Sequence, residues 1–263
     1  GKDIPGDYAT SGEGFDRTSL TPPGIQPELI KAIYDTGKPI ILVMVHGRAY
    51  SIEWEKEHIP AIVEAWYPGE EGGNAVANIL FGEVNPSGKL PVSVPKSVGH
   101  VPTFYNTKPS GKGFYYKRGT KEKPGRDYVF SSPDALFPFG HGLSYTQFEY
   151  SDLKVENTKL DRKESVNISM AIKNIGIRKG KEVIQVYIND KVSSVTTPIK
   201  VLKEFRKIEL KPSETKKVEF SIPIEELGLW NKNMEYSIES GEFDIMIGSS
   251  SEDIRLTKTI MIN

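Results

Sequence analysis

The chain has 263 residues, enough for one large domain or two ordinary ones. Hydrophobic residues make up 37% and charged residues 26%, so the chain is able to form a packed core. The 34 lysine and arginine residues are balanced by 35 aspartate and glutamate residues, which argues against a nucleic-acid partner. No apolar run approaches the roughly 20 residues of a membrane span, so no membrane partner is expected. The lack of cysteine excludes disulfides, thiolate metal sites and cysteine nucleophiles.

The first 102 residues predict alternating helices and strands. Gln26–Thr36 places apolar side chains at helical spacing, and Pro39–Val45 is apolar on both faces, as in a buried parallel strand. A helix capped by Ser51, a strand at Ala61–Trp66 and a helix at Glu70–Phe81 follow. Most aromatic residues lie in this half of the chain and in the loop after it. The pattern predicts an α/β fold.

Residues 103–135 carry many aromatic side chains among Gly, Pro and Lys, with no steady period. Such a long loop is either functional or a flap that covers the edge of the domain. From Leu153 onward, apolar residues alternate in short runs that are separated by turn signals. About seven short strands over the last ~110 residues are typical of a two-sheet sandwich of immunoglobulin or fibronectin type III type.

Several motifs that would carry chemistry are absent. Gly82–Leu90 has the wrong glycine spacing for a phosphate loop and Leu90 where Ser or Thr is required. The four histidines lack metal-ligand spacing, so neither a metal nor a cofactor is expected. The segment Ser11–Arg17 (SGEGFDR) is different, because Glu13 stands between two glycines that let a ligand approach the backbone. A lone loop carboxylate is usually only a solvated charge, so spacing by itself leaves the role of Glu13 open.

Five segments in order give the sequence a specific resemblance to glycoside hydrolase family 3, the family of β-glucosidases and related exo-acting enzymes. They are Ser11–Arg17, Lys38–Arg48, Ala65–Ala75, Phe81–Pro95 and Leu136–Tyr150. Asn174–Ile188 also resembles the fibronectin-like C-terminal domain of that family. The resemblance covers the chain from about Tyr8 to its end.

The resemblance implies a fold and a division into domains. We expect an α/β plus all-β protein. Residues 1–149 would form the C-terminal part of a three-layer α/β sandwich with a mostly parallel sheet, incomplete because its first strands are missing. Residues 150–263 would form a fibronectin type III-like β-sandwich. The barrel domain that carries the Asp nucleophile in the family is not found in this sequence.

The resemblance also implies a function. The chain is expected to belong to a bacterial, retaining, exo-acting β-glucosidase that hydrolyses terminal β-D-glucosyl residues, with Glu13 as the general acid/base. Its partners would be a β-glucoside or oligosaccharide and a barrel-containing N-terminal polypeptide of the same enzyme. The chain alone is expected to be inactive. A periplasmic or secreted location is favoured over a cytoplasmic one, although the sequence fixes no compartment.

Other residues are weaker candidates for binding substrate. Trp66 and the loop aromatics Tyr115 and Tyr116 could stack on a second sugar, since aromatic rings suit the apolar faces of pyranoses. Trp66 could equally pack in the core, and Arg48 and His46, at a strand end, could be purely structural. The alternative function is a non-catalytic carbohydrate-binding or adhesion module, which would not need Glu13 on its glycine-flanked loop.

Overall fold

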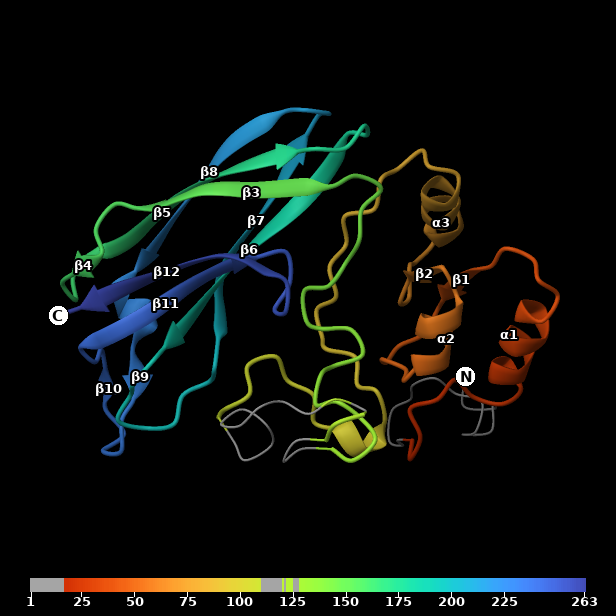
Figure 1. The fold of residues 1–263 in the computed structure, drawn as a ribbon, viewed down its shortest axis with the longest axis horizontal. Helices are drawn as coiled ribbons and strands as arrows, with labels where there is room; N and C mark the ends of the chain where they lie inside the picture. The colour runs from red at the N-terminus through yellow and green to blue at the C-terminus, as the bar shows by residue number, and fades with distance from the viewer. Residues whose placement is uncertain (1–16, 110–119, 121, 125–127) are drawn as a thin grey trace. The chain divides into compact units, whose positions relative to one another are not determined.

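The computed structural model describes residues 17–109, 120, 122–124 and 128–263, and these form two compact units. The first unit comprises residues up to Val84 together with Ser93–Thr103 and Ala135–Phe137. The second unit comprises Asn85–Val92, Phe104–Asp134 and Pro138–Asn263. The chain therefore passes between the units several times, and each unit is described by itself (Figure 1). The domain boundary at residues 149 and 150 stays a prediction.

The first unit is built on a small βαβ motif. Strands β1 and β2 pair in parallel, with Ile41 opposite Ala61 and Met44 opposite Glu64, and helix α2 connects them. Helix α1 precedes β1 and helix α3 follows β2, so the predicted order of helices and strands is confirmed. The bounds are α1 Gln26–Tyr34, β1 Ile41–Met44, α2 Glu53–His58, β2 Ala61–Glu64, α3 Gly72–Leu80 and the short 3₁₀ helix η1 Val98–His100.

Two details of the first unit differ from the sequence predictions. β1 is not buried on both faces, because Ile41 is 51% exposed and Val45, which directly follows the strand, is 55% exposed. Among the described residues its sheet has only the two strands β1 and β2, so one edge and part of one face of β1 have no neighbour. Ser51 is not the cap of α2. The cap position is Ile52, and the Ser51 hydroxyl instead donates to the Pro95 carbonyl at 3.0 Å.

The second unit is a β-sandwich, which confirms the predicted fold of this part. One sheet has the order β4-β12-β11-β6-β7 and the other the order β3-β5-β8, with a separate hairpin of β9 and β10. The bounds are β3 Phe148–Val155, β4 Lys159–Leu160, β5 Ser165–Asn174, β6 Gly180–Asp190, β7 Val201–Leu210, β8 Thr215–Pro223, η2 Ile224–Leu227, β9 Leu229–Trp230, β10 Tyr236–Ser237, β11 Gly241–Gly248 and β12 Ile254–Ile262.

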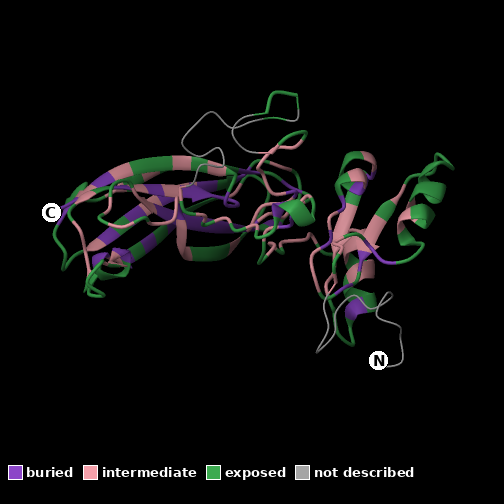
Figure 2. Cartoon of the chain, turned by 90° about the horizontal axis from the view of Figure 1, so that it is seen from below, coloured by how far each residue is buried: buried purple, intermediate pink, exposed green. Residues whose placement is uncertain are grey.

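The apolar core of the sandwich lies between its two sheets (Figure 2). On β5 the alternate residues Val166, Ile168, Met170 and Ile172 are buried, as period-2 patterning requires. β6 is buried on both faces. One face, with Ile184, Val186 and Ile188, belongs to the core cluster. The chain segments that run between the units cover the other face.

Those covering segments bind β6 through polar and aromatic contacts. The Gln185 amide donates to the Gly140 carbonyl at 3.2 Å and to the Ser249 carbonyl at 2.6 Å. Tyr105 stacks on Phe139 with ring centroids 4.3 Å apart and meets Tyr187 edge to face at 5.8 Å. Phe139 and Gly140, which precede the first strand of the sandwich, are thus packed on β6 and have a structural role.

A second polar group on β6 is also held by a covering segment. The Glu182 carboxylate accepts the Tyr150 hydroxyl at 2.8 Å and lies 3.8 Å from the Lys89 ammonium. Burial raises the pKa of Glu182, while the charge of Lys89 and the hydrogen bond from Tyr150 oppose that rise. Burial also lowers the pKa of Lys89. The two charges therefore offset part of each other's desolvation cost.

Candidate functional site

Three of the predicted site residues, Glu13, Tyr115 and Tyr116, lie outside the described residues. Arg48 and Trp66 are described, and both are half-buried. They follow the carboxyl ends of β1 and β2, the edge where α/β sheets usually meet their ligands. Among the described residues, the candidate site is therefore the edge of the sheet at the carboxyl ends of β1 and β2.

The backbone holds the two strand ends together beyond the strands themselves. The Ala65 amide donates to the Met44 carbonyl at 2.9 Å, and the His46 amide donates to the Trp66 carbonyl at 3.2 Å. The parallel pairing predicted for these strands therefore continues by two residues and places His46 beside Trp66. The predicted strand Ala61–Trp66 ends earlier, at Glu64, because Trp66 has a φ of 51°.

A positive φ is costly for a residue with a large side chain. The left-handed region costs about 1–2 kcal/mol for a non-glycine residue. Local strain of this kind persists where neighbouring contacts fix the conformation. For Trp66 those contacts are the backbone bond to His46 and the contact between the two rings, whose centroids are 5.4 Å apart.

His46 is the centre of a small cluster that we call the His46 cluster: His46, Tyr50, Glu64 and Trp66. His46 is only 1% exposed. Its Nε2 lies 3.1 Å from Oε2 of Glu64, to which it is hydrogen-bonded, and 2.9 Å from Oε1. Its ring also meets Tyr50 edge to face at 4.8 Å. Among the described residues, Nδ1 of His46 is buried and has no hydrogen-bond partner.

The His46 cluster can orient side chains. With Nε2 bonded to a carboxylate, the imidazole ring is fixed in one orientation, and it contacts the rings of Tyr50 and Trp66 edge to face. The result is a rigid wall at the carboxyl edge of the sheet, with Trp66 partly open to solvent. This arrangement places Trp66 in contact with the packed cluster and leaves it half-buried. The stacking of Trp66 on a sugar stays a prediction.

His46 and Trp66 were expected from the sequence, whereas their partners Tyr50 and Glu64 were not. The signal for Glu64 was present, because it occupies the last position of a short strand that pairs with the strand before His46. Tyr50 stands in irregular chain and gave no periodic signal. The backbone also ties this edge to the N-terminal segment, since the Ser51 amide donates to the Leu20 carbonyl at 2.8 Å.

Comparison with known proteins gives the family. Residues 4–145 match the glycosyl hydrolase family 3 C-terminal domain, and residues 182–251 match a fibronectin type III-like domain. The chain belongs to glycoside hydrolase family 3, in which it corresponds to the C-terminal region. No helix among the described residues has the length and apolar character needed to cross a bilayer.

Named relatives agree with this family. The chain is 43% identical over 249 residues to a β-xylosidase from Formosa agariphila, covering 93% of this chain and 33% of that protein. It is 42% identical over 246 residues to a periplasmic β-glucosidase from Salmonella typhimurium, covering 92% of this chain and 32% of that protein. The crystal structure of a β-glucosidase from Listeria innocua in complex with glucose matches with a TM-score of 0.87 at 34% identity, over 96% of this chain and 35% of that one. The chain thus spans about a third of the length of its relatives.

Proposed function

We propose that the chain supplies the general acid/base, Glu13, to a retaining, exo-acting β-glycosidase that removes terminal β-D-glucosyl residues. The observation that carries the proposal is the segment Ser11–Arg17, within the range matched by the family's C-terminal domain. The names of the relatives support a glycosidase, since they are β-glucosidases and β-xylosidases.

The proposed chemistry needs two carboxyl groups. In a retaining glycosidase they lie about 5–5.5 Å apart, one as the nucleophile and one as the proton donor and later the base. Glu13 would take the second role. The nucleophile would come from a barrel-containing polypeptide of the same enzyme, because the chain spans only a third of the length of its relatives. We therefore expect the chain alone to be inactive.

The edge of the sheet at β1 and β2 would help to bind the substrate. We assign substrate contacts to Trp66, through stacking on a sugar face, and to Arg48, through hydrogen bonds to sugar hydroxyls. His46 and Glu64 would act as positioning residues that hold Trp66 in its left-handed conformation. Tyr115 and Tyr116 are further proposed contacts from the aromatic loop.

The test of Glu13 is the dependence of rate on the leaving group. In the complete enzyme, Glu13→Gln should slow glucosides with poor leaving groups by roughly 10²–10⁴, the usual contribution of a general acid. Aryl glucosides with good leaving groups need little protonation and should lose much less in the glycosylation step. Stopped-flow and steady-state rates over a series of aryl β-glucosides would give this dependence.

A matched control removes a carboxylate elsewhere in the same unit. Glu57, an exposed residue on helix α2, can be changed to Gln, which should leave every rate within about twofold, since a surface change has little effect on the fold. Equal slowing of good and poor leaving groups by Glu13→Gln would contradict the assignment. A fully active Glu13→Gln enzyme would instead favour the alternative, a non-catalytic carbohydrate-binding or adhesion module.

The sugar itself needs a separate measurement. Both a β-xylosidase and a β-glucosidase are among the similar proteins, so the ratio of kcat/KM for aryl β-glucosides and aryl β-xylosides decides between them. We expect the glucoside to be preferred. A higher kcat/KM for the xyloside would change the proposed substrate and leave the role of Glu13 intact.

A further inference from the structure

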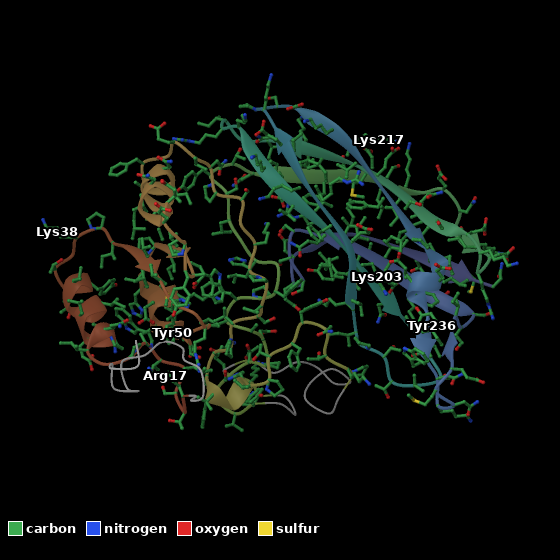
Figure 3. The ribbon with its side chains drawn as sticks, turned by 180° about the vertical axis from the view of Figure 1, so that it is seen from behind. Arg17, Lys38, Tyr50, Lys203, Lys217 and Tyr236 are labelled. Atoms are coloured by element: carbon green, nitrogen blue, oxygen red, sulfur yellow. The ribbon has the colours of Figure 1, made fainter. Side chains whose placement is uncertain are left out.

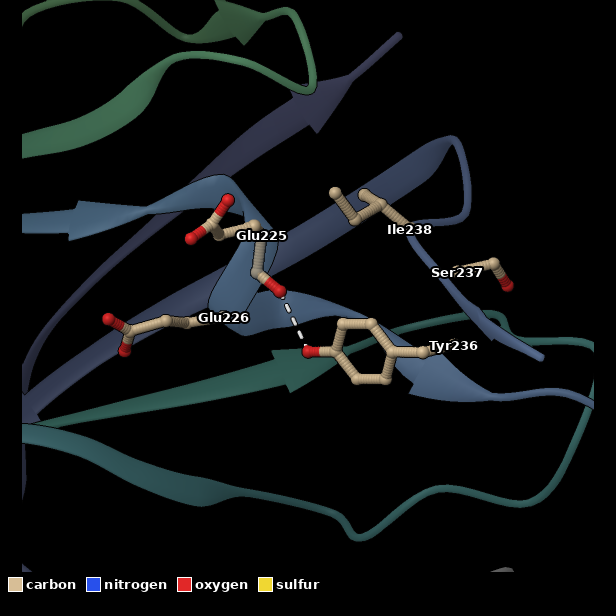
Figure 4. Close-up of a pocket in the computed structure, with 5 residues that line it drawn as sticks. All are labelled: Glu225, Glu226, Tyr236, Ser237 and Ile238. Atoms are coloured by element: carbon tan, nitrogen blue, oxygen red, sulfur yellow. Dashed lines mark hydrogen bonds between the residues drawn. The ribbon is translucent and has the colours of Figure 1, made fainter. Parts of the chain in front are cut away.

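A small open hollow lies at one end of the sandwich, between η2 and the β9–β10 hairpin. It has a volume of about 440 Å³. Figure 4 shows the residues that line it: Glu225, Glu226, Tyr236, Ser237 and Ile238. All of them belong to the second unit. This volume is within the range of small-molecule sites, about 300–1,000 Å³.

The short helix η2 forms one side of the hollow, through Glu225 and Glu226. In a 3₁₀ helix, residues three apart lie on one face. Ile224 and Leu227 are both buried in the core cluster, so they anchor η2 to the sandwich. Glu225 and Glu226 lie between them and are exposed. Among the described residues, neither carboxylate accepts a hydrogen bond or forms a close ion pair.

Tyr236 forms a fixed wall of the hollow. Its hydroxyl donates to the Glu225 carbonyl at 2.7 Å. Its ring packs directly on Gly228, where a Cβ atom would lie only 2.7 Å from two ring carbons. The ring is therefore held at its hydroxyl and along its edge, which leaves it little freedom to lose when a ligand binds.

Trp230 does not line the hollow itself but contacts Tyr236, which does. It is the cross-strand partner of Tyr236 in the hairpin, and the two ring centroids are 5.6 Å apart at an angle of 64°. Trp230 is 61% exposed and Tyr236 is 49% exposed. The turn that joins them is ordered, since the Asn231 side chain accepts from the amides of Asn233 and Glu235. A large, rigid aromatic surface is thus left open beside polar oxygen atoms.

We propose that this end of the sandwich binds a neutral oligosaccharide chain, with one pyranose ring stacked on the exposed ring of Trp230 beside the hollow and its hydroxyl groups donating to oxygen atoms of the residues that line the hollow. A pyranose has an apolar face and a rim of hydroxyl groups, which match an aromatic surface flanked by acceptors. The site lies in the fibronectin type III-like unit and does not depend on the proposed activity.

The lining argues against the two main alternatives. A specific protein interface needs about 20–30 residues a side, whereas five residues line this hollow. A basic peptide would suit the two carboxylates, but a positive charge is already close by, since the Lys203 ammonium donates to the backbone carbonyl of Glu226. Lys203 and Tyr236 come from different strands and are both marked in Figure 3. An uncharged ligand is not repelled by Lys203, and it does not have to lose the hydration of a cation when it binds.

The test is titration of the 263-residue chain with cellopentaose, laminaripentaose and xylopentaose, followed by calorimetry and tryptophan fluorescence. At least one sugar should bind saturably, and Trp230→Ala should weaken that binding about tenfold or more through loss of the stacking surface. Trp230→Phe, which keeps an aromatic ring, should restore most of the affinity. Because Trp230 is exposed, the melting temperature should not change in either variant.

Three controls make the outcome decisive. Ile177→Ala removes an exposed apolar side chain in the turn between β5 and β6, which does not line the hollow, and it should leave binding unchanged. Affinity for the sugar should be equal at about 0.05 and 0.5 M NaCl, because no ion pair is formed. Pentalysine, the peptide probe, should not bind. The proposal is overturned if no pentasaccharide binds, if Trp66→Ala abolishes binding and Trp230→Ala does not, or if pentalysine binds in a salt-dependent way at this hollow.

Discussion

Gln185 shows how one polar residue organises the sandwich. A buried amide in an otherwise apolar strand costs free energy unless it is hydrogen-bonded. Gln185 donates to the Gly140 and Ser249 carbonyls and accepts the Tyr187 hydroxyl at 2.5 Å. It therefore joins β6 to the end of β11 and to the segment that arrives from the first unit. An apolar residue of the same size would leave the partner groups unpaired.

Gly140 is the residue that allows this approach, and its substitution is the first stability prediction. Its φ is 79°, and a Cβ atom there would lie 2.1 Å from Oε1 of Gln185. Gly140→Ala should lower the free energy of unfolding by about 2–4 kcal/mol, from left-handed strain and a displaced amide. Urea denaturation of the second unit measures this loss. Gly88→Ala, where no atom lies within 4 Å of the new Cβ, is the matched control. Equal stability of the two variants would contradict the argument.

Strands β1 and β6 show what the sequence can and cannot predict. Both have apolar residues on both faces, a pattern that predicts burial on both sides. The prediction is confirmed for β6, which has β11 and β7 as neighbours and a covering segment outside. It is wrong for β1. Burial on both faces requires neighbours on both sides, and β2 is the only strand that pairs with β1 among the described residues. The apolar pattern predicts that a segment is a strand with two apolar faces, whereas the burial of those faces depends on the elements that pack against them.

The hairpin of β9 and β10 was missed for a different reason. Each of its strands has only two residues, which is too short for any alternation to be recognised. Trp230 gave no signal either, since a single exposed aromatic residue has no periodic context. Similarly, Glu64 is part of the candidate site only through its contact with His46, and side-chain contacts between elements are not encoded in local patterns.

At the scale of elements, we predict where the sandwich unit must begin. Residues 150–263 contain the strands β4 to β12 and most of β3, and should unfold cooperatively. However, this piece lacks Lys89 and Gly140, which meet Glu182 and Gln185. A chain of residues 85–263 should therefore be more stable, by about 1–3 kcal/mol for each buried group that regains its partner. Thermal melts of the two truncated chains would measure the difference.

The reverse result would define the unit differently. If residues 150–263 melt at the same temperature as residues 85–263, the covering segments contribute nothing to the sandwich, and the boundary at residues 149 and 150 is the physical one. A broad, non-cooperative melt of the shorter chain would show that these segments are essential to the fold. The proposed oligosaccharide hollow is made entirely of residues in both truncated chains, so its binding serves as a check that the sandwich has formed.

At the scale of the whole molecule, the first unit exposes apolar surface. Helix α1 has no buried residue, and Leu29 and Ile33 on it are exposed. Ile41 on β1 is also exposed, and among the described residues β1 pairs only with β2. Surfaces of this kind usually bind a partner or promote aggregation. Since relatives are about three times as long as this chain, we expect a barrel-containing polypeptide of the same enzyme to cover that surface.

This expectation gives the last prediction, which concerns activity and association together. The 263-residue chain alone should not turn over an aryl β-glucoside, because Glu13 provides a proton donor without a nucleophile. Addition of the barrel-containing polypeptide should restore turnover and should protect the amides of β1 from hydrogen exchange, as the free edge acquires a partner. The Glu13→Gln variant of the chain, mixed with the same polypeptide, should show the same protection of the β1 amides. It should not regain full activity toward glucosides with poor leaving groups. Steady turnover by the purified chain would refute the prediction and would require a nucleophile among its own carboxylates. Restored activity without any new protection of β1 would show that the partner binds elsewhere.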